Sequence, residues 1–256
     1  MTLQTISVEV SARQIATVTL NRPDRGNSFN QNMLDELSEQ LIALGADNHV
    51  RVVVLRGSGR HFCTGADLAS RRGAPAQEPA KASPTLRDVL VALDTLPKPT
   101  IAVVHGGAIG GGAALPACCD VALATEVAFF SIPEVRVGMA PFGVTPFLIR
   151  AMGHRNFRRY GLSGERITPA EALRIGLLHQ VCDGASVDET LGRITDDLLH
   201  GAPGALVELK NFAAQFASPT LSAILAQSAP HDPRSPEAVE GIASFREKRK
   251  PSWYPQ

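Results

Sequence analysis

Three consecutive glycines, Gly110, Gly111 and Gly112, stand between an apolar run at residues 101–104 and an alanine-rich stretch that begins at Ala113. The apolar run predicts a strand, and the alanine-rich stretch predicts a helix. Glycines at such a junction leave backbone N–H groups uncovered by side chains, at the end of a helix whose dipole favours negative charge. We therefore expect an anionic group, or a group that becomes anionic during a reaction, to dock there.

A second junction lies at residues 60–68, which read Arg-His-Phe-Cys-Thr-Gly-Ala-Asp-Leu and follow an apolar run that ends near Leu55. The glycine junction occupies residues 105–115. In a parallel sheet, ligands bind outside the carboxyl ends of the strands, so loops that follow neighbouring strands converge. One backbone amide from each loop could then hold a single oxygen atom.

The glycines taken alone leave three interpretations open. Their spacing within residues 106–112 fits the G-x-x-x-G-x-G pattern with which short-chain dehydrogenases hold a dinucleotide, but Tyr160 is followed four positions later by Gly164 instead of Lys. Residues 105–107, His-Gly-Gly, resemble the oxyanion strand of esterases, yet the sequence contains no G-x-S-x-G nucleophile elbow. The third interpretation is that the glycines serve only close helix packing.

Apolar residues along the first half of the chain recur in the periods of strands and helices. Residues 6–10 and 15–20 alternate as the strands of a hairpin do. Asn30 is placed to cap a helix that Gly45 ends. The later periods predict a strand at 50–55, a helix at 89–96, a strand at 101–104, a helix at 113–119 and a strand at 121–124. This alternation implies crossover units on a parallel sheet, and hence an α/β fold.

Beyond Pro169 the apolar periodicity is helical. The predicted helices are 170–175, 187–199, 204–216, 221–227 and 236–248. The segment 221–227 is apolar enough to pack on a partner. Residues 71–84 lack periodicity and are rich in Ala, Pro and Arg, which predicts a surface loop, either an inert linker or a segment that closes over a ligand.

The composition excludes several classes of function. The 25 Lys and Arg residues balance the 25 Asp and Glu residues, so no overall field attracts nucleic acid or a membrane surface. The N-terminal residues resemble neither a signal nor a transit peptide, and no apolar run approaches the ~18 residues of a membrane span. We expect a soluble, cytoplasmic protein with buried, reduced thiols at Cys63, Cys118, Cys119 and Cys182.

The two junctions occur in a fixed order with further short motifs. These are residues 20–23 (Leu-Asn-Arg-Pro), Asp120, 131–134 (Ser-Ile-Pro-Glu), Gly138, 162–164 (Leu-Ser-Gly), 170–172 (Ala-Glu-Ala) and 245–249 (Phe-Arg-Glu-Lys-Arg). Each motif is weak by itself, and the combination is specific. From about Ile6 to Trp253 the chain closely resembles the enoyl-CoA hydratase/isomerase superfamily, the crotonases.

The resemblance implies the crotonase fold, in which repeated ββα units build a mainly parallel sheet. It implies that residues 1–195 form a core that binds coenzyme A and holds the active site. Residues 196–256 would form a helical region that assembles homotrimers, or hexamers made of two trimers. The substrate would be an acyl-CoA thioester, with coenzyme A entering only as part of that substrate, and no further cofactor and no metal is implied.

The resemblance also implies roles for individual residues. The carbonyl oxygen of the thioester would lie between the N–H groups of Thr64 and Gly111, which stabilise the enolate oxygen, and Glu134 would be the acid/base. Plain structural roles stay open for Asp67 as a helix N-cap and for Arg25 as a solvated charge. The residues expected to contact the substrate or its coenzyme A are Arg25, Thr64, Gly65, Ala66, Asp67, Leu68, Gly110, Gly111, Phe245 and Lys248.

The number of carboxylates bears on the reaction. Typical hydratases of this superfamily carry two Glu residues, and the first position is Ala114 in this chain, which leaves Glu134 alone. Apolar neighbours of Glu134 should raise its pKa toward the range that a general acid/base needs. A single base is sufficient for a Δ3,Δ2-enoyl-CoA isomerase.

A second comparison favours hydration over isomerisation. Residues 133–153, which include Thr-Pro-Phe at 145–147, resemble the methylglutaconyl-CoA and isohexenylglutaconyl-CoA hydratase-like branch, whose members also lack the first Glu. The expected activity is therefore hydration of a 2-enoyl-CoA, including a branched or glutaconyl-type acyl group. The alternatives are an isomerase and a non-catalytic acyl-CoA-binding relative.

Overall fold

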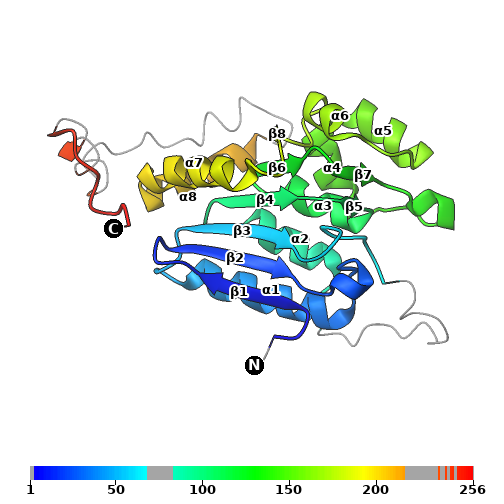
Figure 1. The fold of residues 1–256 in the computed structure, drawn as a ribbon, viewed down its shortest axis with the longest axis horizontal. Helices are drawn as coiled ribbons and strands as arrows, with labels where there is room; N and C mark the ends of the chain where they lie inside the picture. Colours follow the sequence, from blue (N-terminus) through cyan, green and yellow to red (C-terminus); the bar gives the residue numbers. More distant parts are fainter. Residues whose placement is uncertain are drawn as a thin grey trace.

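A six-stranded sheet runs through the middle of the molecule (Figure 1). The computed structural model describes residues 3–67, 83–216, 236, 240, 243–244 and 247–255. The strands lie in the order β1 (Ile6–Val10), β2 (Ile15–Leu20), β3 (Val52–Gly57), β4 (Thr100–Val104), β6 (Val121–Thr125) and β8 (Gln180–Cys182). Only β1 and β2 pair antiparallel in this sheet. The predicted α/β fold with a mainly parallel sheet is confirmed.

Helices cover both faces of this sheet (Figure 1). On one face Val53 and Leu55 of β3 belong to the main core with α1 (Gln31–Ala46), α2 (Leu86–Asp94) and α3 (Gly111–Cys118). On the other face Val52 and Val54 pack in a second cluster with α7 (Val187–His200). Burial on both sides explains why β3 is a continuous apolar run and lacks alternation.

The N-terminal elements follow the prediction, with one correction. The hairpin of β1 and β2 is confirmed, and the side chain of Asn30 caps α1 by accepting a hydrogen bond from the N–H of Met33 at 2.9 Å. The prediction that Gly45 ends this helix is wrong, because α1 continues to Ala46. A Cβ at Gly45 would lie 3.3 Å from a methyl group of Leu96, so this glycine serves close packing.

Several short elements were not predicted from the sequence. They are a separate parallel pair, β5 (Gly107–Ile109) and β7 (Phe129–Ser131), the 3-10 turns η1 (Pro23–Arg25) and η2 (Glu134–Val137), and the helices α4 (Thr145–Met152) and α5 (His154–Ser163). The helix predicted from Ala113 begins at Gly111 instead, so that two of the three glycines form its first turn. Three-residue strands are too short to show a period of two.

The C-terminal helices lie close to their predicted positions. They are α6 (Pro169–Arg174), α7, and α8 (Pro203–Gln215). The predicted division between residues 195 and 196 falls inside α7, and it stays a prediction. The predicted helix at 221–227 and residues 71–82 of the predicted loop lie outside the described residues. Within 236–248, the described residues 236, 240, 243–244 and 247 are helical, whereas Lys248 lies in a turn.

Two further expectations from composition can be compared with the structure. All four cysteines are buried free thiols, as predicted. Within the described ranges, no helix combines the length and the apolar character that crossing a membrane requires.

Close packing makes Gly112 a strong test of the fold. A Cβ on Gly112 would lie 2.3 Å from the carbonyl oxygen of Cys63, so Gly112→Ala must move backbone and should lower the free energy of unfolding by about 1–3 kcal/mol. Gly192 in the helix α7 has open space around it, so Gly192→Ala should raise stability by about 0.5–1 kcal/mol. Urea denaturation of both variants measures the difference. Equal stability of Gly112→Ala and the wild type would contradict this packing.

Candidate active site

The loops that follow β3 and β4 meet, as the sequence predicted. The N–H of Cys63 donates to the carbonyl of Gly107 at 3.1 Å, and the N–H of Ile109 donates to the carbonyl of Cys63 at 2.9 Å. Gly65 has a φ of +86°, and a Cβ there would lie 2.8 Å from the carbonyl oxygen of Ile109. Only glycine permits this approach, which brings the second junction against the start of α3.

The structure corrects the role expected of the Thr64 amide. Its N–H donates to the carbonyl of Gly26 at 3.0 Å, and the Thr64 hydroxyl donates to the same oxygen at 3.1 Å. An N–H that is already bonded to a carbonyl does not bind a ligand oxygen without breaking that bond. Thr64 therefore anchors the loop to the turn at Gly26.

Ala66 presents the amide that Thr64 does not. Phe29 donates its N–H to the carbonyl of Gly65 and accepts from the N–H of Asp67, at 2.7 and 2.9 Å. In this pairing pattern the N–H of Ala66, which lies between the two bonded groups, points away from Phe29. Among the hydrogen bonds of the described residues, none uses the Ala66 N–H, and Ala66 is exposed.

The second uncommitted amide belongs to Gly111. As the first residue of α3 it has no acceptor within the helix, whereas the neighbouring Gly110 N–H donates to the carbonyl of Ser131 at 2.8 Å. No hydrogen bond within the described ranges uses the Gly111 N–H. A Cβ on Gly65 would lie 3.8 Å from the Gly111 nitrogen, so the loop that carries Ala66 is next to this amide.

Glu134 brings a carboxylate to the same point. It opens η2, which begins shortly after β7 ends at Ser131, and its Oε1 lies 2.6 Å from the position that a Cβ on Gly110 would take. Gly110 has φ +56° and ψ −125°, a conformation that favours glycine, so the backbone and the close carboxylate both require this residue.

The environment of this carboxylate favours its neutral form. Glu134 Oε2 is buried and has no hydrogen-bond partner among the described residues. Burial raises the pKa of Glu134 above its ordinary value. A buried carboxylate oxygen without a partner costs stability, so its presence close to two uncommitted amides indicates a chemical role.

The side chains over Gly111 were not predicted. A Cβ on Gly111 would lie 2.4 Å from Leu86 Cδ2 and 3.3 Å from Phe29 Cε2, so Leu86 and Phe29 cover this glycine. Leu86 is the first residue of α2, where Thr85 and Asp88 form a capping box. The spacing of Thr85 and Asp88 was the available sequence signal, because a capping box marks a helix start and would have moved it from Val89 to Leu86.

The remaining predicted contact residues separate into three groups. The buried Asp67 forms an ion pair with the partly exposed Arg22 at 3.0 Å, and this bond ties its loop to the segment before η1. Arg25 in η1 and Lys248 near the C-terminus are both exposed, and their contacts with coenzyme A stay predictions. Leu68 and Phe245 lie outside the described residues. Ala114 is fully buried in α3, and no carboxylate comes from that position.

Comparison with known proteins decides the family. The family model of enoyl-CoA hydratase/isomerase matches residues 11–256. The chain belongs to the enoyl-CoA hydratase/isomerase family. The predicted crotonase fold is thereby confirmed, and the chain is an enzyme of the hydratase/lyase type.

Individual members of the family match along nearly the whole chain. The enoyl-CoA hydratase AFT6-1 of Alternaria alternata is 32% identical over 244 residues, which are 91% of this chain and 78% of the relative. The 2,3-dehydroadipyl-CoA hydratase of Escherichia coli is 33% identical over 245 residues, 94% of this chain and 95% of the relative. The structure of Pseudomonas aeruginosa AtuE superimposes with a TM-score of 0.91 at 32% identity, covering 98% of this chain and 100% of that chain.

The raised pKa of Glu134 predicts a pH-dependent cost to stability. A carboxyl group with a raised pKa in the folded state contributes its full stability below the unfolded pKa and loses it as pH rises through the folded pKa. Glu134→Gln should therefore match the wild type near about pH 4 and exceed its free energy of unfolding by about 0.5–2 kcal/mol near about pH 7. Glu126→Gln, at an exposed carboxylate, is the control and should change stability little at either pH. A gain for Glu134→Gln that is the same at both pH values would contradict the raised pKa.

Proposed function

We propose that this protein is an enoyl-CoA hydratase that adds water to the double bond of a 2-enoyl-CoA. The observation that carries the proposal is the half-buried Glu134 side chain, whose Oε2 is buried without a hydrogen-bond partner among the described residues and which packs against Gly110 near the uncommitted amides of Ala66 and Gly111. Membership of the enoyl-CoA hydratase/isomerase family supports the same activity. Ala66 takes the place that the sequence assigned to Thr64.

The two amides bind the carbonyl oxygen of the thioester. Both N–H groups are fixed in position before the substrate arrives, because Ala66 lies between two backbone bonds to Phe29 and Gly111 begins a helix. Electron density moves onto this oxygen when a nucleophile attacks the conjugated double bond, and preorganised donors then bind it more tightly. Each donor of this kind lowers the barrier by about 3 to 4 kcal/mol.

Glu134 moves the protons. Its carboxylate takes a proton from a water molecule while the water oxygen forms a bond to C3 of the enoyl group, and the electron pair of the double bond moves onto the thioester oxygen as an enolate. The protonated Glu134 then returns its proton to C2, and the carbonyl is restored. The raised pKa of this carboxyl brings its proton affinity closer to that of the groups with which it exchanges a proton.

The acyl group in this proposal carries a free carboxylate at the end away from the thioester, as in glutaconyl-type thioesters. Residues 133–153 support it through their resemblance to the glutaconyl-CoA hydratase-like branch. The relative from Escherichia coli is named for 2,3-dehydroadipyl-CoA, which is also a dicarboxylic thioester. The coenzyme A contacts of Arg25, Gly65, Ala66 and Lys248, assembly as a homotrimer or hexamer, and a cytoplasmic location remain predictions of the family resemblance.

Isomerisation of a 3-enoyl-CoA is the second candidate. The fully buried Ala114 favours it, because this position supplies no second carboxylate to hold a water molecule. An isomerase would use the same amides, with Glu134 moving a proton between C4 and C2.

Spectroscopy of Glu134→Gln tests the proposal. The wild type should hydrate a 2-enoyl-CoA, which removes the absorbance of the conjugated thioester, and the variant should be slower by about 10²–10⁴-fold while still binding coenzyme A thioesters. Glu126→Gln should retain the wild-type rate. Formation of that absorbance from a 3-enoyl-CoA, without hydration of the 2-enoyl-CoA, would establish the isomerase instead. An unchanged rate in Glu134→Gln would end the assignment of Glu134.

A further inference from the structure

Arg87 lies close to the residues that are proposed to bind and react with the thioester. It follows Leu86, whose side chain covers Gly111, at the start of α2. Its Cβ lies 4.0 Å from the position that a Cβ on Gly143 would take, and Gly143 belongs to the loop between η2, which begins with Glu134, and α4. Arg87 thus lies between the segment over the Gly111 amide and the segment that follows the catalytic carboxylate.

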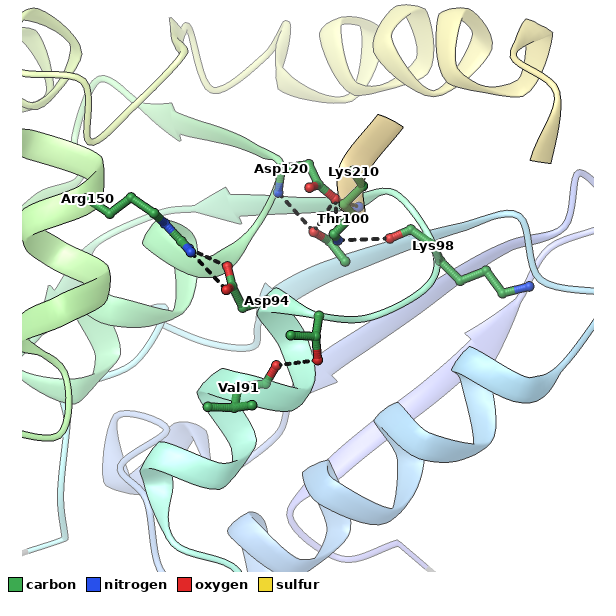
Figure 2. A network of polar contacts seen from close by, with 8 residues as sticks. Val91, Asp94, Lys98, Thr100, Asp120, Arg150 and Lys210 are labelled. Carbon is green, nitrogen blue, oxygen red and sulfur yellow. Dashed lines mark hydrogen bonds and ion pairs between the residues drawn. The ribbon is translucent and has the colours of Figure 1, made fainter. Parts of the chain in front are cut away.

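The position of Arg87 is held from the other end of α2. Arg150 of α4 donates to the carboxylate of Asp94, the last residue of α2, with a distance of 2.9 Å from Nη1 to Oδ2 (Figure 2). This ion pair joins α2 to the helix that follows the Gly143 loop. The pair restricts movement of α2 relative to α4.

The residue Arg87 is exposed, and its side chain has no hydrogen bond or ion pair among the described residues. The nearest carboxylate in sequence, Asp88, already accepts from the N–H and the hydroxyl of Thr85 at 2.8 and 2.7 Å. A cation in the first turn of a helix also opposes the helix dipole. The helix dipole therefore does not favour an arginine at this position, and its charge is accessible to a ligand.

We propose that Arg87 binds the distal carboxylate of the acyl chain and so selects dicarboxylic enoyl-CoA thioesters. The thioester oxygen at the Gly111 amide would lie beneath Leu86. Arg87 is the next residue, and its Cα is ~3.8 Å from that of Leu86. A short acyl chain that runs between Leu86 and the Gly143 loop brings its far end to this guanidinium. The planar guanidinium forms two parallel hydrogen bonds with a carboxylate.

This role rests on the proposed hydratase function, and its test separates the two. The substrates are 2,3-dehydroadipyl-CoA and 2-hexenoyl-CoA, whose six-carbon chains differ in the terminal carboxylate. Arg87→Met should lower kcat/KM for 2,3-dehydroadipyl-CoA by about 10- to 100-fold and leave kcat/KM for 2-hexenoyl-CoA within about twofold of the wild type. Arg87→Lys keeps the charge but loses the two parallel hydrogen bonds. Its kcat/KM for 2,3-dehydroadipyl-CoA should lie between those of the wild type and Arg87→Met.

Binding of saturated thioesters gives a second readout that requires no chemistry. Calorimetry with adipyl-CoA and hexanoyl-CoA should show the same selective loss of affinity for the dicarboxylic ligand in Arg87→Met. Arg193→Met is the control, at an exposed arginine in α7 on the opposite face of the sheet. It should leave the affinity for both ligands unchanged.

Three results would overturn the role of Arg87. The first is an equal loss of kcat/KM or affinity for the dicarboxylic and the monocarboxylic thioester in Arg87→Met. The second is no loss for either thioester, and the third is the same selective loss in Arg193→Met. If the wild type hydrates neither enoyl thioester while Arg87→Met still loses affinity for adipyl-CoA alone, the hydratase function fails and the carboxylate site stands. If the wild type hydrates both and Arg87→Met changes nothing, the hydratase stands and this role fails.

Discussion

Close approach to a bare backbone at the start of α3 is the constraint on which the site depends. Each of the three glycines is approached by a different group: the Glu134 carboxylate at Gly110, Leu86 and Phe29 at Gly111, and the Cys63 carbonyl at Gly112. Any side chain there would displace one of these groups. The same feature leaves the Gly111 amide without an acceptor, so the packing and the proposed oxygen site have one origin.

The loop that carries Ala66 shows how the protein fixes a backbone donor without side-chain chemistry. Phe29 holds Gly65 and Asp67 by backbone bonds, Thr64 is tied to Gly26, and the Asp67 carboxylate is paired with Arg22. These bonds remove the freedom that would otherwise be lost when a ligand binds. Glu134 has the opposite effect on stability. Its buried oxygen has no hydrogen-bond partner among the described residues, and this lowers the free energy of unfolding.

The periodicity of apolar residues predicted the long helices and strands. Features that depend on tertiary contacts could not be predicted from the local sequence. The apolar runs of β3 and β4 and the spacing of α1 gave their positions within a few residues, since burial dictates these patterns. Gly45 was read as a helix end, although its small size serves packing against Leu96. Such a contact between distant segments leaves no mark on the local sequence.

Prediction of the site from the sequence also failed where it depended on the direction of a single backbone N–H group. The motif brought both loops to the correct place, but the assignment of the donor to Thr64 failed because Gly65 has a φ of +86°. This left-handed residue interrupts the regular alternation of backbone groups, so Thr64 and Ala66 direct their N–H groups to different sides. Arg87 was not singled out from the sequence, because the role proposed for it depends on where α2 begins and on a loop that lies far along the chain.

A crystal structure with a bound saturated acyl-CoA tests the central claim most directly. The carbonyl oxygen of the thioester should lie about 2.7–3.1 Å from the backbone nitrogens of both Ala66 and Gly111, with C2 and C3 of the acyl chain facing Glu134. The bond from the Thr64 N–H to the Gly26 carbonyl should remain intact. A thioester oxygen bound to the Thr64 N–H, or placed away from the Gly111 amide, would contradict the account.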